Sequence, residues 1–138
     1  MRTTRRTRGL TLIETMAAVA ITGVLATIAV PSYRSAQLRS HRADATYSLQ
    51  QLQQAQDAHR ERHGGYAERL DQLPGWSAGQ SRHGHYRIQL QGSPDGLAYT
   101  ATALAQGAQA ADTECTTVTL RVEWAMSFQG PQPGCWHS

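Results

Sequence analysis

The sequence predicts an α+β fold in which one long N-terminal helix packs on an antiparallel β-sheet. Residues 32–62 contain neither Gly nor Pro, and Leu38, Leu49 and Leu52 recur there at helical spacing. Later segments alternate apolar and polar residues, as half-buried strands do. A helix followed by strands, without further alternation of the two, is typical of an α+β domain.

The helix is predicted to cover residues 10–63, and its first part, residues 10–30, is apolar enough to cross a membrane. At roughly 1.5 Å per residue this run is about 31 Å long, the thickness of a bilayer core. Gly64 and Gly65 then end the helix. Residues 1–9 form a basic leader without acids, which keeps that end in the cytoplasm. The leader's arginines are Arg2, Arg5, Arg6 and Arg8.

Residues 64–138 are predicted to form a globular β-sheet domain after a turn-rich loop. In "HYRIQLQ", Tyr86, Ile88 and Leu90 alternate with polar residues, which predicts the first strand. "SPDG" is a turn, and "LAYTATALA" and "TTVTLRVEWAMSF" predict two or three further strands. The order favours an antiparallel meander that follows the long helix.

Composition and motifs argue against several classes of function. The formal charge of +3 belongs to the leader, because the nine remaining arginines face ten acids. The pI of 9.2 is therefore no argument for nucleic-acid binding. The sequence contains no nucleophile elbow, P-loop or suitably spaced carboxylate pair. His59 and His63 would share a helix face, but a metal site needs more ligands. We predict a non-enzymatic protein without metal or cofactor.

The two cysteines, Cys115 and Cys135, bound a C-terminal region of the predicted globular domain. If the domain is exported, a disulfide between them would contribute about 3 kcal/mol to a small core. Two thiols without a close histidine or cysteine partner do not make the four ligands of a structural zinc site.

Three interpretations compete for the N-terminal segment. A secretory signal peptide has a shorter apolar region and a small-residue cleavage site, whereas this run continues into a helical pattern beyond Pro31. A plain membrane anchor leaves Glu14, the one ionisable group in the run, without a partner. Cleavage after Gly9 would give Leu10 a free amino group within about one helical turn of Glu14.

The motif "RGLTLIET", followed by the apolar run and Pro31, resembles the class III signal of type IV pilins and type II secretion pseudopilins. The resemblance implies that a prepilin peptidase cuts between Gly9 and Leu10 and methylates the new amino terminus. It also implies that Glu14 pairs with the N-terminal amine of a neighbouring subunit and sets the register of assembly. The first mature residue is usually Phe in this family, whereas Leu10 stands here.

Two later stretches are similar to type IV pilins in particular. "ERHGGYAERLDQLPG" is similar to the segment in which many pilins leave the helix. "CTTVTLRVEWAMSFQGPQPGCW" resembles their disulfide-bounded C-terminal region, which implies a Cys115–Cys135 disulfide. Pseudopilins usually lack this pair and place acidic calcium ligands near the C-terminus. The resemblance favours a type IV pilin and keeps the pseudopilin as an alternative.

The resemblance implies a structural subunit, major or minor, of a pilus used for adhesion, twitching motility or DNA uptake. Its expected partners are other pilin subunits, the prepilin peptidase and the inner-membrane assembly platform. Residues 10–30 would span the inner membrane once, with the N-terminus cytoplasmic. After assembly they would form the filament core of a pilus that crosses the periplasm and reaches the cell exterior.

A second hypothesis is that the chain is a DNA-binding minor pilin that acts as a receptor in natural transformation. Arginine and aromatic side chains on one surface hold phosphates and bases. The candidate residues on the early helix are Arg34, Arg39 and Arg42, and those around the first strand are Arg82, His83, His85, Tyr86 and Arg87. Alternatively these charges are solvated or pair across subunits with Asp44, Asp57 and Glu61. The sequence favours charges that are solvated or paired across subunits, and hence weak or absent DNA binding at moderate salt.

Replacing Glu14 by Ala tests the register hypothesis. The variant should insert into the membrane normally, because the apolar run is intact, and should enter filaments less well, because the buried amine loses its partner. Membrane fractionation and the pilin content of sheared pili measure the two effects. Unchanged incorporation into pili would contradict the hypothesis.

Overall fold

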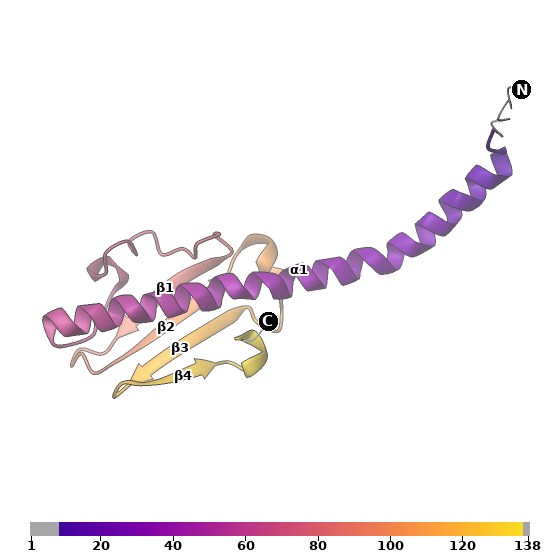
Figure 1. Cartoon of the computed structure of the whole chain (residues 1–138). Helices are drawn as coiled ribbons and strands as arrows, with labels where there is room; N and C mark the ends of the chain where they lie inside the picture. Colours follow the sequence, from indigo (N-terminus) through magenta and orange to yellow (C-terminus); the bar gives the residue numbers. More distant parts are fainter. Residues whose placement is uncertain (1–8, 137–138) are drawn as a thin grey trace, which may run out of the picture. The chain divides into compact units, whose positions relative to one another are not determined.

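The computed structural model describes residues 9–136, so residues 1–8 of the predicted leader lie outside the described part of the chain. A long helix, α1 (Leu12–His63), is followed by four strands (Figure 1). The strands are β1 (Tyr86–Gly92), β2 (Ala98–Ala105), β3 (Thr117–Glu123) and β4 (Met126–Gly130). Three short 3₁₀ helices accompany them: η1 (Leu70–Gln72), η2 (Gly107–Ala111) and η3 (Pro133–Cys135). The predicted α+β class is confirmed.

The chain divides into two compact units, of which the first ends at Ser35 and the second is Ala36–Ser138. The part of α1 in the first unit is long and apolar enough to cross a membrane, and its apolar window buries nothing inside the protein. The helix continues through Pro31. A row of exposed large apolar side chains needs a lipid or protein environment to be stable. The fold thus leaves the predicted membrane segment free to contact lipid or another protein.

The second unit contains an antiparallel sheet in the order β1-β2-β3-β4. The register places Ile88 opposite Ala103 and Ala103 opposite Val118, so buried residues line up across three strands. The later part of α1 lies along this face of the sheet (Figure 1). Leu49 and Leu52 of α1 are fully buried in the same core. Each such side chain contributes roughly 1.5–3 kcal/mol on burial.

The loop between α1 and β1 is tied to both elements. Gln56 is buried and holds Ala67 by two hydrogen bonds, donating to its carbonyl at 3.0 Å and accepting from its N–H at 2.7 Å. At the sheet edge, a Cβ on Gly92 would lie 2.5 Å from the Ala67 carbonyl oxygen, so only glycine fits there. The loop therefore has a fixed course over the end of the helix.

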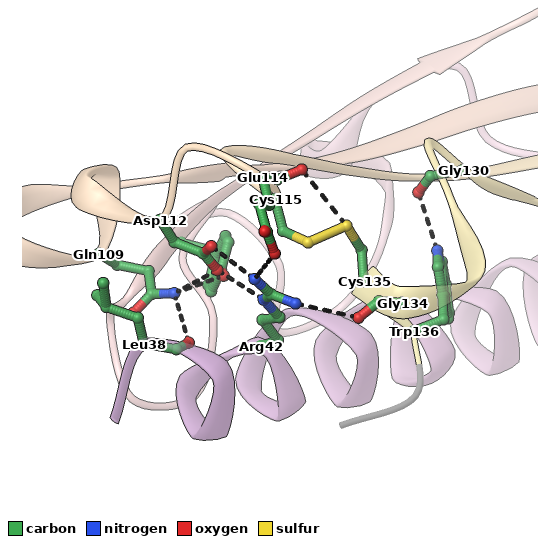
Figure 2. The surroundings of a disulfide bond; sticks show 11 residues. Leu38, Arg42, Gln109, Asp112, Glu114, Cys115, Gly130, Gly134, Cys135 and Trp136 are labelled. Atoms are coloured by element: carbon green, nitrogen blue, oxygen red, sulfur yellow. Dashed lines mark hydrogen bonds and ion pairs between the residues drawn. A yellow bond between two sulfur atoms is a disulfide. The ribbon is translucent and has the colours of Figure 1, made fainter. Parts of the chain in front are cut away.

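A buried ion pair joins α1 to the C-terminal region. Arg42 donates from Nε and Nη2 to the two carboxylate oxygens of Asp112, both at 2.7 Å (Figure 2). It also donates to the carboxylate of Glu114 at 3.0 Å and to the Gly134 carbonyl at 3.2 Å. The hydrogen bonds that Arg42 donates to Asp112 and Glu114 raise its pKa, so the guanidinium stays charged despite its burial.

The predicted disulfide between Cys115 and Cys135 is confirmed, and both cysteines are fully buried (Figure 2). Strands β3 and β4 lie between them in the sequence, so the bond connects the two ends of this hairpin. The following residue, Trp136, donates from its indole nitrogen to the Gly130 carbonyl at 2.9 Å. Closing a loop of this length contributes about 3 kcal/mol.

The ion pair can be tested by replacing Arg42 with Ala in the unit Ala36–Ser138. The free energy of unfolding should fall by about 3–5 kcal/mol, because Asp112 is left as an unpaired buried charge. Arg39→Ala is the matched control, since Arg39 is exposed on the same helix and should change stability by less than about 0.5 kcal/mol. Urea denaturation measures both; equal effects would contradict a structural role for the pair.

Candidate functional site

The start of the helix contains the predicted processing and assembly residues. Thr11 and Glu14 form a reciprocal capping box: the Thr11 N–H donates to Glu14 Oε2, and the Glu14 N–H donates to Thr11 Oγ1, both at 3.4 Å. Gly9, Leu10 and Glu14 are all exposed. Glu14 thus has a weak local partner within its own chain, which the Thr-x-x-Glu pattern could have indicated. Its exposed carboxylate remains accessible to a second chain.

The globular unit has a hollow of about 510 Å³ between α1 and the end of the loop that leads into β1. From α1 it is lined by Ser40, His41, Ala43, Asp44 and Tyr47, and from the loop by Arg82, His83 and His85. Three histidines and an arginine from two distant parts of the sequence therefore meet around one depression.

Asp44 fixes the loop side of the hollow. This buried carboxylate accepts hydrogen bonds from the Ser81 hydroxyl at 2.5 Å, from the His83 N–H at 3.1 Å and from the His85 N–H at 3.3 Å. The loop backbone is thereby held against α1. Because both oxygens are used inside the fold, Asp44 does not serve as the partner of an arginine from another subunit.

The three histidine rings of the hollow lie close together. The rings of His41 and His85 stack with their centroids 3.9 Å apart and their planes within 10°. His83 is next to them, with its ring centroid 6.3 Å from that of His85. His41 Nδ1 lies 3.1 Å from Oε1 of the buried Gln109. The stack is therefore positioned from the core and not only by exposed side chains.

Arg82 and Tyr47 also line the hollow. The Arg82 guanidinium lies 5.8 Å from the centroid of the exposed Tyr47 ring, a cation–π geometry. Within the described part of the chain, Arg82 has no ion pair. Its charge is thus available to an anion, and the ring beneath it limits its motion.

A second hollow, of about 720 Å³, shares Tyr47 and Arg82 with the first. Its polar lining is made of amides, and the aromatic Trp76 stands beside them. The amide residues are Gln51, Gln54 and Gln80. Glutamine and arginine are side chains that read base edges, and aromatic rings stack on bases. The two hollows together form one surface with cationic and amide parts.

The predicted DNA residues separate into two groups. The structure brings Arg82, His83 and His85 together at the hollow. Arg87 is exposed on β1 and does not line it. Two predictions are corrected: Tyr86 is 0% exposed with its hydroxyl accepting from Gln109, and Arg42 is 6% exposed and paired with Asp112. Neither can contact DNA.

Burial also alters the chemistry of Tyr86. Removal from water raises the pKa of its hydroxyl, and the hydrogen bond from Gln109 opposes this effect in part. The hydroxyl stays neutral at physiological pH and serves as an acceptor that helps to hold the Gln109 amide. Through Gln109, Tyr86 thus supports the position of His41 in the histidine stack. His41 and Tyr47 were not predicted, because they come from α1, far from the loop in sequence.

Comparison with known families agrees with this arrangement. Residues 31–119 match the family described as "Type IV minor pilin ComP, DNA uptake sequence receptor". The chain belongs to the type IV minor pilin family. Residues 4–30 of the pilin match the prokaryotic N-terminal methylation motif. The predicted class, including its pilin fold, is confirmed.

A curated relative is similar to part of this pilin. The type IV major pilin protein PilA of Myxococcus xanthus (strain DK1622) is 49% identical over 51 residues. The match covers 37% of this pilin and 23% of that relative. This chain thus spans less than a quarter of the length of that relative. The methylation motif and the apolar helix of the chain fit a pilin anchored in the inner membrane.

Proposed function

We propose that this minor pilin is a DNA receptor, and that it binds DNA at the surface formed by the two hollows. The observation that carries the proposal is Arg82, an arginine held over Tyr47 and flanked by three imidazoles within the family-matched region. All residues of both hollows fall within residues 31–119. The family is described as a DNA uptake sequence receptor, which supports DNA as the ligand.

The surface offers separate groups for the two parts of a nucleotide. Arg82 and the histidines supply donors and positive charge for phosphates. Tyr47 and Trp76 supply rings, and the glutamines supply amides, for bases. The histidines line only the first hollow and the glutamines only the second, so bound DNA would have a defined orientation.

The charge balance favours local contacts over general attraction. Beyond the leader the chain has slightly more acids than arginines, so long-range attraction to DNA is weak. Affinity must then come from a few well-placed side chains. This argument and the family match together reverse the preference for solvated charges that the sequence alone favoured.

Maturation and assembly form the second part of the proposal. A prepilin peptidase cuts between Gly9 and Leu10, and the inner-membrane platform then moves the chain into the filament. Glu14 leaves its weak bond to Thr11 and pairs with the N-terminal amine of a neighbouring subunit, which relieves two unpaired charges at once. The role is structural and receptor-like, without catalysis.

DNA binding can be measured with the mature chain, starting at Leu10, in a nonionic detergent. The leader must be absent because its four arginines would bind DNA themselves. Fluorescence anisotropy with duplexes selected from a random-sequence library should give a salt-dependent Kd. Arg82→Gln should weaken binding at least about fivefold, as the loss of one arginine contact does.

Arg87→Gln is the matched control, since Arg87 is an exposed arginine five positions later that does not line the hollow. It should leave the Kd unchanged. Equal losses for the two variants would indicate general electrostatic attraction and contradict the proposed surface. Absence of binding by the unaltered chain would contradict the receptor function itself.

A further inference from the structure

We propose that His41, His83 and His85 form an oxyanion site that takes up protons as a phosphate group binds. The part of this inference that names DNA phosphate as the ligand rests on the proposed function. The site itself rests on the geometry of the three rings. Its consequence is that the pilin holds phosphate more tightly at mildly acidic pH than at alkaline pH.

The hydrogen bonds of Gln109 decide where His41 carries its proton. The Gln109 amide nitrogen donates to the Leu38 carbonyl at 2.9 Å, and a carbonyl only accepts (Figure 2). The amide oxygen of Gln109 therefore faces His41 Nδ1, which must be the donor in that bond. His41 Nε2 is left free to gain a proton. Protonation then leaves the bond to the core intact.

His83 and His85 are held through their backbone N–H groups and not through their ring nitrogens. The N–H groups of His83 and His85 donate to Asp44, which fixes both residues in place. Among the described residues, neither ring has a hydrogen-bond partner of its own. Imidazole is the side chain that changes charge near physiological pH. The two residues thus have a fixed backbone and ring nitrogens that are available to a ligand.

The stack couples protonation to anion binding. With the rings of His41 and His85 only 3.9 Å apart, charging both places two positive charges face to face, which is unfavourable. An oxyanion at the edge of the stack offsets this repulsion by accepting hydrogen bonds from both rings. The second proton therefore enters together with the anion.

The surrounding charges favour an anion over a cation. Asp44 and Tyr47 face the site from α1, and Arg82 faces it from the loop. Through Gln109 the site also borders Asp112, whose charge is balanced by Arg42, and the neutral hydroxyl of Tyr86. Once the rings are protonated, positive charge exceeds the single carboxylate of Asp44. In the part of the chain that the structure describes, no three acidic, histidine or cysteine residues are placed to hold a metal.

The test uses the mature chain from Leu10 in nonionic detergent, with the selected duplex as probe at constant ionic strength. Between about pH 8 and about pH 5.5, a range that spans imidazole titration, affinity should rise about tenfold. A variant with His41, His83 and His85 all replaced by Asn should lose this rise and still bind at the higher pH through Arg82. Asn at position 41 keeps a donor for Gln109.

His59→Asn with His63→Asn is the matched control. These two rings also lie together, with centroids 4.3 Å apart, but they belong to the far end of α1 and do not line the hollow. The control should keep the full pH dependence. The single variant His83→Asn, at an exposed position, should lose part of it and guards against misfolding of the triple variant. A pH dependence that survives in the triple variant would overturn the inference.

Inorganic phosphate separates the inference from the proposed function. Added near pH 6, it should shift the ring carbon-bound proton signals of His41 and His85 in NMR spectra and leave those of His59 unchanged. If no variant binds DNA at either pH but phosphate shifts these signals, the receptor function fails and the oxyanion site stands. If phosphate shifts neither signal, the site is refuted even where DNA binds.

Discussion

The buried ion pair between Arg42 and Asp112 joins parts of the globular unit that are far apart in the sequence. It links α1 to the segment after η2 and, through the Gly134 carbonyl, to the region closed by the disulfide (Figure 2). Burying two charges is costly, and the bidentate geometry with further hydrogen bonds offsets that cost. The same Asp112 lies 3.4 Å from the Gln109 amide. One charge pair thus connects the core to the histidine stack.

The connection between the buried ion pair and the histidine stack explains how a small pilin can present a defined surface. Parts of the lining of the hollow are fixed from inside: His41 by Gln109, and the loop backbone by Asp44. The Arg82 guanidinium has a cation–π contact with Tyr47. Side chains held in this way lose little freedom when a ligand binds, so more of the contact energy appears as affinity. A net charge close to zero outside the leader makes such preorganisation the main source of selectivity.

Much of the fold could be predicted from local patterns. The spacing of Leu49 and Leu52 gave the sheet-facing stripe of the helix, and alternation from Tyr86 onward gave the first strand. The same patterns could have corrected two residues of the site. Arg42 lies three positions before the buried Ala45 on the same helix face, and Tyr86 shares its strand face with Ile88. Residue type alone places Arg42 and Tyr86 on the surface, whereas their positions on the helix and strand faces place them inside.

The sequence could not predict that His41 and Tyr47 line the same hollow as Arg82, because this proximity results from tertiary packing of the loop on α1. No local pattern indicates which face of a helix a distant loop will cover. At the N-terminus the reverse holds, since the Thr11-x-x-Glu14 pattern of a capping box is itself visible in the sequence. Partnerless charges in a sequence therefore call for a check of local capping before a partner in another chain is invoked.

The most direct test of this account is to map where DNA touches the mature pilin by hydrogen–deuterium exchange with and without the selected duplex. The account predicts added protection in residues 40–47 of α1 and residues 80–85 of the loop, and none on the exposed side of the sheet around Arg87 and Arg121. Protection confined to the sheet side, with both segments unchanged, would contradict it.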